Sequence, residues 1–108
     1  MEKKVLLNDN IIDEMESLIK VASDSTRLRI MFALLDMNNE NHVVEKCVGE
    51  INTEVGISQS LCSHQLKILK DAELVGTRKE STKIYYYLKD EHVRKLLEVV
   101  LEHVLEKE

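Results

Sequence analysis

The chain has 108 residues, of which 44% are hydrophobic and 32% charged, with a formal net charge of −5. This length allows one domain with a modest core, and the balance is typical of a folded, mainly helical domain rather than a disordered one. No apolar run approaches the roughly 18 to 20 residues that span a bilayer, so no membrane partner is expected. Residues 1–10 lack the apolar segment of an export signal, which favours a cytoplasmic protein. The negative charge argues weakly against nucleic acid as a partner, although a local basic face can override it.

The first part of the chain predicts two helices. Apolar residues recur at helical spacing from residue 11 to residue 22. The segment SDST at 23–26 offers capping side chains, and apolar residues continue the helical pattern from residue 28 to residue 35. The segment NNEN at 38–41 then predicts a polar loop.

A pair of helices separated by a short turn follows. The third helix is marked by five apolar residues at helical spacing: Val44, Cys47, Val48, Ile51 and Val55. Gly56 stands where a C-cap is expected, and Ser58 is a candidate N-cap for a fourth helix that runs to about Ala72. A helix, a short turn containing glycine and a second helix are the outline of a helix-turn-helix.

The remaining sequence predicts a β-hairpin and a last helix. Residues 74–79 and 83–88 alternate or are rich in β-branched and aromatic residues, with EST between them. We therefore predict one domain over residues 1–108, mainly α with a small β-hairpin. It has the layout of a winged helix-turn-helix, with the helix-turn-helix at about 43–72, the wing at about 74–88 and a C-terminal helix at about 90–106.

One face of the fourth helix has the composition of a DNA-reading surface. Five polar residues fall within an arc of about 140° on a helical wheel: Gln59, Ser60, Ser63, His64 and Lys67. Hydroxyl, amide, imidazole and ammonium groups bind base edges and phosphates in a major groove. In the hairpin, Arg78, Lys79 and Lys83 face one acid, Glu80, which suits flanking phosphates. The alternative is that both surfaces are simply solvated.

The segments ASDSTRLRIMFALL, ISQSLCSHQLKILKDAELV and KIYYYL resemble the ArsR/SmtB family of small dimeric winged-helix repressors. The resemblance covers about residues 18 to 106. Its most specific part, Ser-Gln-Ser-x-x-Ser-His-x-Leu-Lys, is close to the family's recognition-helix pattern. It implies operator DNA as a partner, a homodimer formed through the N- and C-terminal helices, and DNA contacts by Gln59, Ser60, Ser63 and His64. The wing departs from the family at residues 80–82, where relatives often have a glycine.

Two histidines lie on the apolar side of the last helix. His92 and His103 are about 20° apart on the wheel but about 16 Å apart along the axis, so they cannot share a metal ion within one helix. Glu106 is one turn from His103, and Asp90 can approach His92 if it is the N-cap. Two antiparallel copies would bring Asp90 and His92 of one protomer against His103 and Glu106 of its partner. Two nitrogens and two oxygens suit tetrahedral Zn²⁺.

Each of these residues also has a simpler interpretation, since Asp90 can be only a cap, Glu106 only a solvated acid, and each histidine a core residue. The spacing of the four residues, however, resembles the C-terminal-helix metal site of the family's zinc-sensing branch. Imidazole and carboxylate ligands favour zinc, with cobalt as a plausible substitute. The family's thiolate site uses Cys-x-Cys, whereas this chain has Cys47-Val48-Gly49. Cys47 and Cys62 are both predicted to be core residues.

These features predict a repressor that binds double-stranded operator DNA as a homodimer and releases it on binding Zn(II). One alternative is a repressor of the same family that responds to thiol oxidation or another ligand. Another is a zinc-stabilised interaction module or a small hydrolase. Four protein ligands leave no open coordination position, and no nucleophile constellation is present, so no enzymatic activity or small-molecule substrate is expected.

Overall fold

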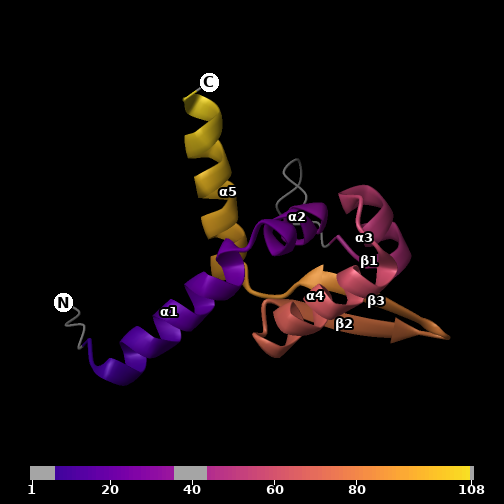
Figure 1. The fold of residues 1–108 in the computed structure, drawn as a ribbon, viewed down its shortest axis with the longest axis horizontal. Coiled ribbons are helices and arrows are strands. Elements are labelled where there is room, and N and C mark those ends of the chain that lie inside the picture. Colours follow the sequence, from indigo (N-terminus) through magenta and orange to yellow (C-terminus); the bar gives the residue numbers. More distant parts are fainter. Residues whose placement is uncertain (1–6, 36–43, 108) are drawn as a thin grey trace.

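The computed structural model describes residues 7–35 and 44–107. Its elements, in chain order, are α1 (Asp9–Ser23), α2 (Ser25–Ala33), β1 (Lys46–Cys47), α3 (Val48–Val55), α4 (Gln59–Asp71), β2 (Val75–Glu80), β3 (Lys83–Leu88) and α5 (Glu91–Glu106). The predicted order of four helices, a hairpin and a helix is confirmed, and the fold is a winged helix-turn-helix (Figure 1). The loop expected at 38–41 lies outside the described residues. Within the described ranges, no helix has both the length and the hydropathy required to cross a bilayer.

Side-chain caps explain where most of the helices begin and end. Asn8 Oδ1 accepts the amide of Ile11 at the start of α1, and Asp24 and Ser58 cap α2 and α4 in the same way. Such a cap stabilises a helix by about 1 kcal/mol. Gly56 ends α3 with φ at 81°, a left-handed conformation that glycine adopts without strain. The caps at Asp24, Gly56 and Ser58 match those predicted from the sequence, whereas the cap at Asn8 was not predicted.

The start of the third helix was predicted wrongly. Residues 44–47 are not part of α3, which begins at Val48. They precede it because β1 pairs with β3, with Lys46 opposite Tyr86 and Cys47 opposite Tyr85. The wing is therefore a three-stranded antiparallel sheet in the order β1-β3-β2 rather than an isolated hairpin. Helical spacing of apolar residues cannot reveal a two-residue edge pairing that only the tertiary fold creates.

The core lies between α2, α3, α4 and the sheet. Its fully buried side chains are Ile30, Met31, Ile51, Cys62, Leu66, Leu69, Leu74 and Val75. From α5, only Val93 and Leu97 are buried, and both belong to the first half of that helix. The prediction that Cys62 is a core residue is confirmed, and burial raises the pKa of its thiol.

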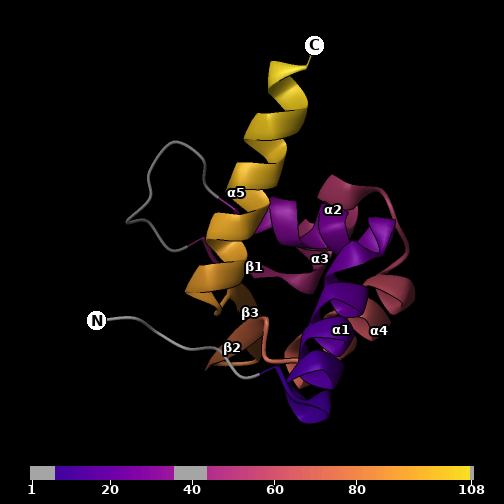
Figure 2. The same ribbon diagram turned by 90° about the vertical axis from the view of Figure 1, so that its left-hand side faces the viewer.

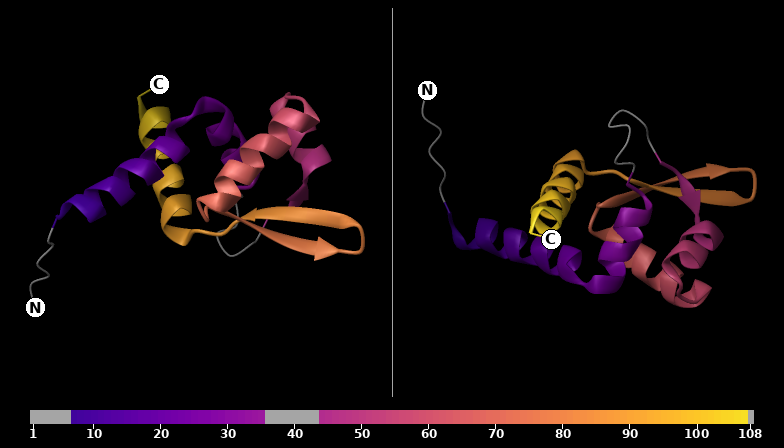
Figure 3. Two further views of the ribbon diagram at one scale, coloured as in Figure 1. Left: turned by 60° about the horizontal axis from the view of Figure 1, so that its bottom comes forward. Right: turned by 90° about the horizontal axis from the view of Figure 1, so that it is seen from above.

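The helices α1 and α5 project from this body (Figures 1 and 2). No residue of α1 is buried. Even on its apolar side, Met15 is 48% exposed and Ile19 is 60% exposed. On α5, Leu96 and Val99 are 54% and 61% exposed. The radius of gyration is 15.4 Å, whereas a compact domain of about 100 residues has a value of about 13 Å. The wing extends on the far side of the body from these two helices (Figure 3).

Candidate nucleic-acid interface and metal site

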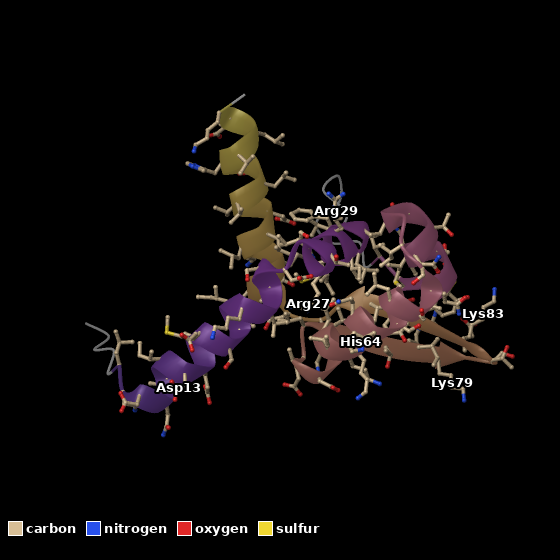
Figure 4. The ribbon with its side chains drawn as sticks, in the orientation of Figure 1. Asp13, Arg27, Arg29, His64, Lys79 and Lys83 are labelled. Carbon is tan, nitrogen blue, oxygen red and sulfur yellow. The ribbon has the colours of Figure 1, made fainter. Side chains whose placement is uncertain are left out.

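The polar face of α4 is held outward by the packing of its opposite face. Cys62, Leu66 and Leu69, at helical spacing, are fully buried against the core. The structure brings together on the outer face all five DNA contacts that were predicted on this helix, each of them exposed: Gln59, Ser60, Ser63, His64 and Lys67. Figure 4 shows His64 on the part of the molecule that carries the wing, away from the free end of α5. This exposed helix has the width and chemistry that a major groove accepts.

Lys67 has an acidic neighbour on α4. Its Nζ lies 3.4 Å from the carboxylate of Asp71, one turn further along α4. Both side chains are largely exposed, at 74% and 68%. An exposed pair of this kind stabilises the protein little, so Lys67 can exchange Asp71 for a phosphate at small cost.

Arg78 is the predicted contact whose surroundings differ most from expectation. Its Nε lies 3.0 Å from both carboxylate oxygens of Glu45, and its Nη1 lies 3.0 Å from Glu80. The guanidinium also lies 4.9 Å from the ring centroid of Tyr85. The hydrogen bonds to Glu45, and after them the one to Glu80, raise the pKa of Arg78 above its usual value. Arg78 therefore links β2, across β3, to the residue that precedes β1.

Lys79 remains available at the wing, where it and Lys83 are exposed (Figure 4). Glu45 was missed by the sequence reasoning because 33 residues separate it from Arg78. Only the pairing of β1 with β3 brings the two together. No local pattern around either residue signals the contact.

The predicted metal ligands form two pairs at opposite ends of α5. Asp90 is the N-cap, and its Oδ1 accepts the amides of His92 and Val93 at 2.9 and 3.1 Å. The His92 side chain is 99% exposed, with its Nδ1 3.9 Å from that oxygen. At the other end, His103 and Glu106 are exposed one turn apart. The described part of one chain holds no cluster of three or more metal-ligating side chains.

The chemistry of each pair fits half of a zinc site. Among the described residues Oδ2 of Asp90 has no hydrogen-bond partner, because the cap uses Oδ1. It can therefore serve as a ligand while the cap stays intact. The imidazole of His92 beside it supplies nitrogen, and the pair His103 and Glu106 supplies the same two donor types. One chain thus provides two pairs of donors rather than one site of four.

Cys47 is not the core residue that was predicted. It is half-buried at the N-cap of α3 because β1 ends there and the helix has not yet begun. Its amide and its Sγ both donate to Glu50 Oε1, at 3.1 and 3.2 Å. Both hydrogen bonds lower the pKa of Glu50, and the one from the backbone amide has the larger effect.

Comparison with known proteins assigns the part of the chain that contains α4 to a known family. The family model described as "Bacterial regulatory protein, arsR family" matches residues 24–77, which include α2, α3 and α4. The chain is 34% identical over 93 residues to a transcriptional repressor SmtB homolog from Synechocystis, covering 86% of this chain and 65% of that protein. It is 34% identical over 101 residues to a CadC homolog, a cadmium resistance transcriptional regulatory protein from Staphylococcus aureus, covering 94% of this chain and 78% of that one.

Among solved structures, the chain is similar to a homodimeric winged helix-turn-helix DNA-binding domain from Mycobacterium bovis. That domain is described as belonging to a possible ArsR-family transcriptional regulator. The TM-score is 0.76 at 26% identity, and the match covers 98% of this chain and 92% of that one. These relatives are described as transcriptional regulators. The chain belongs to the arsR family of bacterial regulatory proteins.

Proposed function

We propose that this protein is a transcriptional repressor that binds operator DNA as a homodimer and releases it on binding Zn(II). The observation that carries the proposal is the arrangement of α5. An uncovered apolar face has a histidine–carboxylate pair at each end, in which only Asp90 is half-buried, on the same chain as an exposed DNA-reading helix.

In this proposal α4 enters the major groove. Gln59, Ser60, Ser63 and His64 reach base edges, whereas Lys67 binds phosphate and the wing adds Lys79. Two such helices in a two-fold dimer would lie in successive major grooves, about 34 Å apart. We assign Arg78 a smaller share of phosphate binding than Lys79, because its guanidinium already pairs with two carboxylates.

The homodimer is supported by the exposed apolar residues of α1 and α5. A groove of about 420 Å³ runs between α1, α2 and α5 and is lined almost entirely by apolar side chains, Ile19, Phe32 and Val100 among them. Contiguous exposed apolar surface marks an interaction site in soluble proteins. The similar domain from Mycobacterium bovis is described as homodimeric. Two-fold pairing with antiparallel α5 helices would join each Asp90–His92 pair to the partner's His103 and Glu106.

Such a dimer would hold Zn(II) at two equivalent sites. Bound there, zinc would cross-link the two α5 helices and favour one relative orientation of the subunits. If that orientation fits DNA poorly, metal weakens DNA binding and DNA weakens metal binding by the same factor. The relatives include a cadmium resistance regulator, but nitrogen and oxygen donors favour zinc, or cobalt, over thiophilic ions.

The test is a DNA-binding titration with and without Zn²⁺, Co²⁺, Ni²⁺ and Cd²⁺, with a duplex that the protein has selected from a random library. We expect zinc to weaken binding most, and His103→Ala to bind DNA normally but keep it when zinc is added. His64→Ala is the matched control, because it should weaken DNA binding while leaving zinc affinity unchanged. Zinc-induced release that survives in His103→Ala would contradict the proposed site.

A second candidate is a repressor that responds to thiol oxidation, and the partial exposure of Cys47 favours it. Cys62 is a poor reactive thiol because it is fully buried. Replacing both cysteines by serine would abolish the response in this case, whereas Asp90→Ala and Glu106→Ala would leave it intact. The zinc proposal predicts the opposite pair of results.

A further inference from the structure

The side chain of Arg27 joins three helices. Its Nε donates to the carbonyl oxygen of Val21 at 2.7 Å, in the last turn of α1. Its Nη1 donates to Oε1 of Gln65 at 2.9 Å, on α4. Its own amide is capped by Asp24 at 3.1 Å, which fixes the start of α2. Figure 4 shows Arg27 where α1 meets the body of the molecule, beside α4.

The bond to Gln65 has no counterpart on α4 in the described part of the chain. The other side-chain hydrogen bonds of that helix stay within it or its cap, as between Lys67 and Asp71. Its remaining contacts with the core are apolar; they decide which face of α4 is buried, but they fix its exact rotation less strictly than a directed hydrogen bond does. A planar guanidinium that donates to two acceptors has a fixed direction. The guanidinium of Arg27 therefore restrains rotation of α4 about the axis of that helix.

We propose that Arg27 and Gln65 are positioning residues that set the rotation of α4 relative to α1. This rests on the proposed function, in which α1 belongs to the dimer interface and α4 reads DNA. A reorientation of the subunits moves the last turn of α1, and the guanidinium transmits that movement to Gln65. Its neighbour His64 lies on the outer face of α4, so a small rotation there changes which side chains meet the bases.

The test removes the acceptor on α4 and leaves the joint between α1 and α2 intact. Gln65→Met keeps the length of this half-buried side chain and loses the bond, whereas Gln65→Glu keeps an acceptor for Arg27. Lys67→Ala is the matched control on the same helix, because it removes a phosphate contact and no link to another element. Three properties are measured: affinity for the selected duplex relative to a scrambled one, the factor by which zinc weakens binding, and amide exchange of α4.

Gln65→Met is expected to lose about tenfold in the preference for the selected duplex, as for one hydrogen bond to a charged group, and most of the zinc effect. Lys67→Ala should weaken binding to both duplexes alike and leave the factor by which zinc weakens binding unchanged. Gln65→Glu should keep both the wild-type preference for the selected duplex and the wild-type zinc effect. The proposal would be overturned if, in Gln65→Met, the preference for the selected duplex and the factor by which zinc weakens binding both stayed within twofold of the wild-type values.

The amide exchange separates this proposal from the proposed function, since it needs neither DNA nor metal. If the wild-type protein fails to prefer any duplex or to respond to zinc, the proposed function is wrong. The restraint on α4 is then judged by exchange alone. Faster exchange of α4 amides in Gln65→Met than in Lys67→Ala supports it, and equal exchange in the two variants overturns it.

Discussion

Asp90 has two roles that one pair of substitutions can separate. Its Oδ1 accepts two amides at the start of α5, a cap that stabilises the protein by about 1 kcal/mol. Asp90→Ala should lose this contribution, which lowers the melting temperature by about 4 to 8 °C for a domain of this size. Asp90→Asn should keep nearly all of it, because asparagine caps helices about as well as aspartate.

Without zinc, Asp90→Asn should be about as stable as the wild-type protein, but zinc should stabilise it much less. At a zinc concentration a hundred times the Kd, the wild-type protein should gain about 2.7 kcal/mol. If loss of the carboxylate weakens binding about a hundredfold, the gain in Asp90→Asn falls to about 0.4 kcal/mol. Thermal melting with and without zinc measures both effects. An unchanged zinc-induced shift in Asp90→Asn would refute the assignment of Asp90 as a ligand, and a normal metal-free melting temperature in Asp90→Ala would refute its role as the cap.

Three further predictions concern the fold. Glu73→Gly should raise stability to urea by about 0.5 to 1 kcal/mol, since Glu73 has φ at 62° and left-handed backbone strains residues other than glycine; no gain would contradict this. Gly76→Ala should lower stability by about 1 to 3 kcal/mol, as its Cβ would lie 2.6 Å from Tyr87 Cζ, and Gly76→Ala with Tyr87→Leu should recover part of the loss. The lowered pKa of Glu50 stabilises the folded state above its unfolded pKa of about 4.3, and this contribution is lost as the pH falls through the folded value. Glu50→Gln should therefore lose less stability than wild type on acidification, and equal acid sensitivity would count against the shift.

The sequence was sufficient for features that depend on neighbouring residues. Ser58 and Gly56 could be recognised because capping and left-handed turns depend on local chemistry, and the outer face of α4 follows from helical periodicity alone. Cys47 was misplaced because β1 exists only through pairing with a strand nearly 40 residues later along the chain. The contact of Arg78 with Glu45 depends on the same pairing.

The metal site illustrates a different limit. The spacing of His92 and His103 argues for two half-sites, and the structure places one histidine–carboxylate pair at each end of α5. Whether the four residues meet depends on how two copies associate, and a single chain does not contain that geometry. It remains a prediction, tested by the substitutions at Asp90 and His103.

The absence of any buried residue in α1 has a consequence for the amount of protein in a cell. An isolated helix of about 15 residues is marginally stable in water, so in the proposed homodimer α1 depends on a second copy for its persistence. Folding of α1 and assembly of the dimer then become one bimolecular event, and dilution should lower the melting temperature. Chains without a partner would be open to proteases, which cleave unfolded segments. The turnover of this regulator should therefore slow as its own concentration rises.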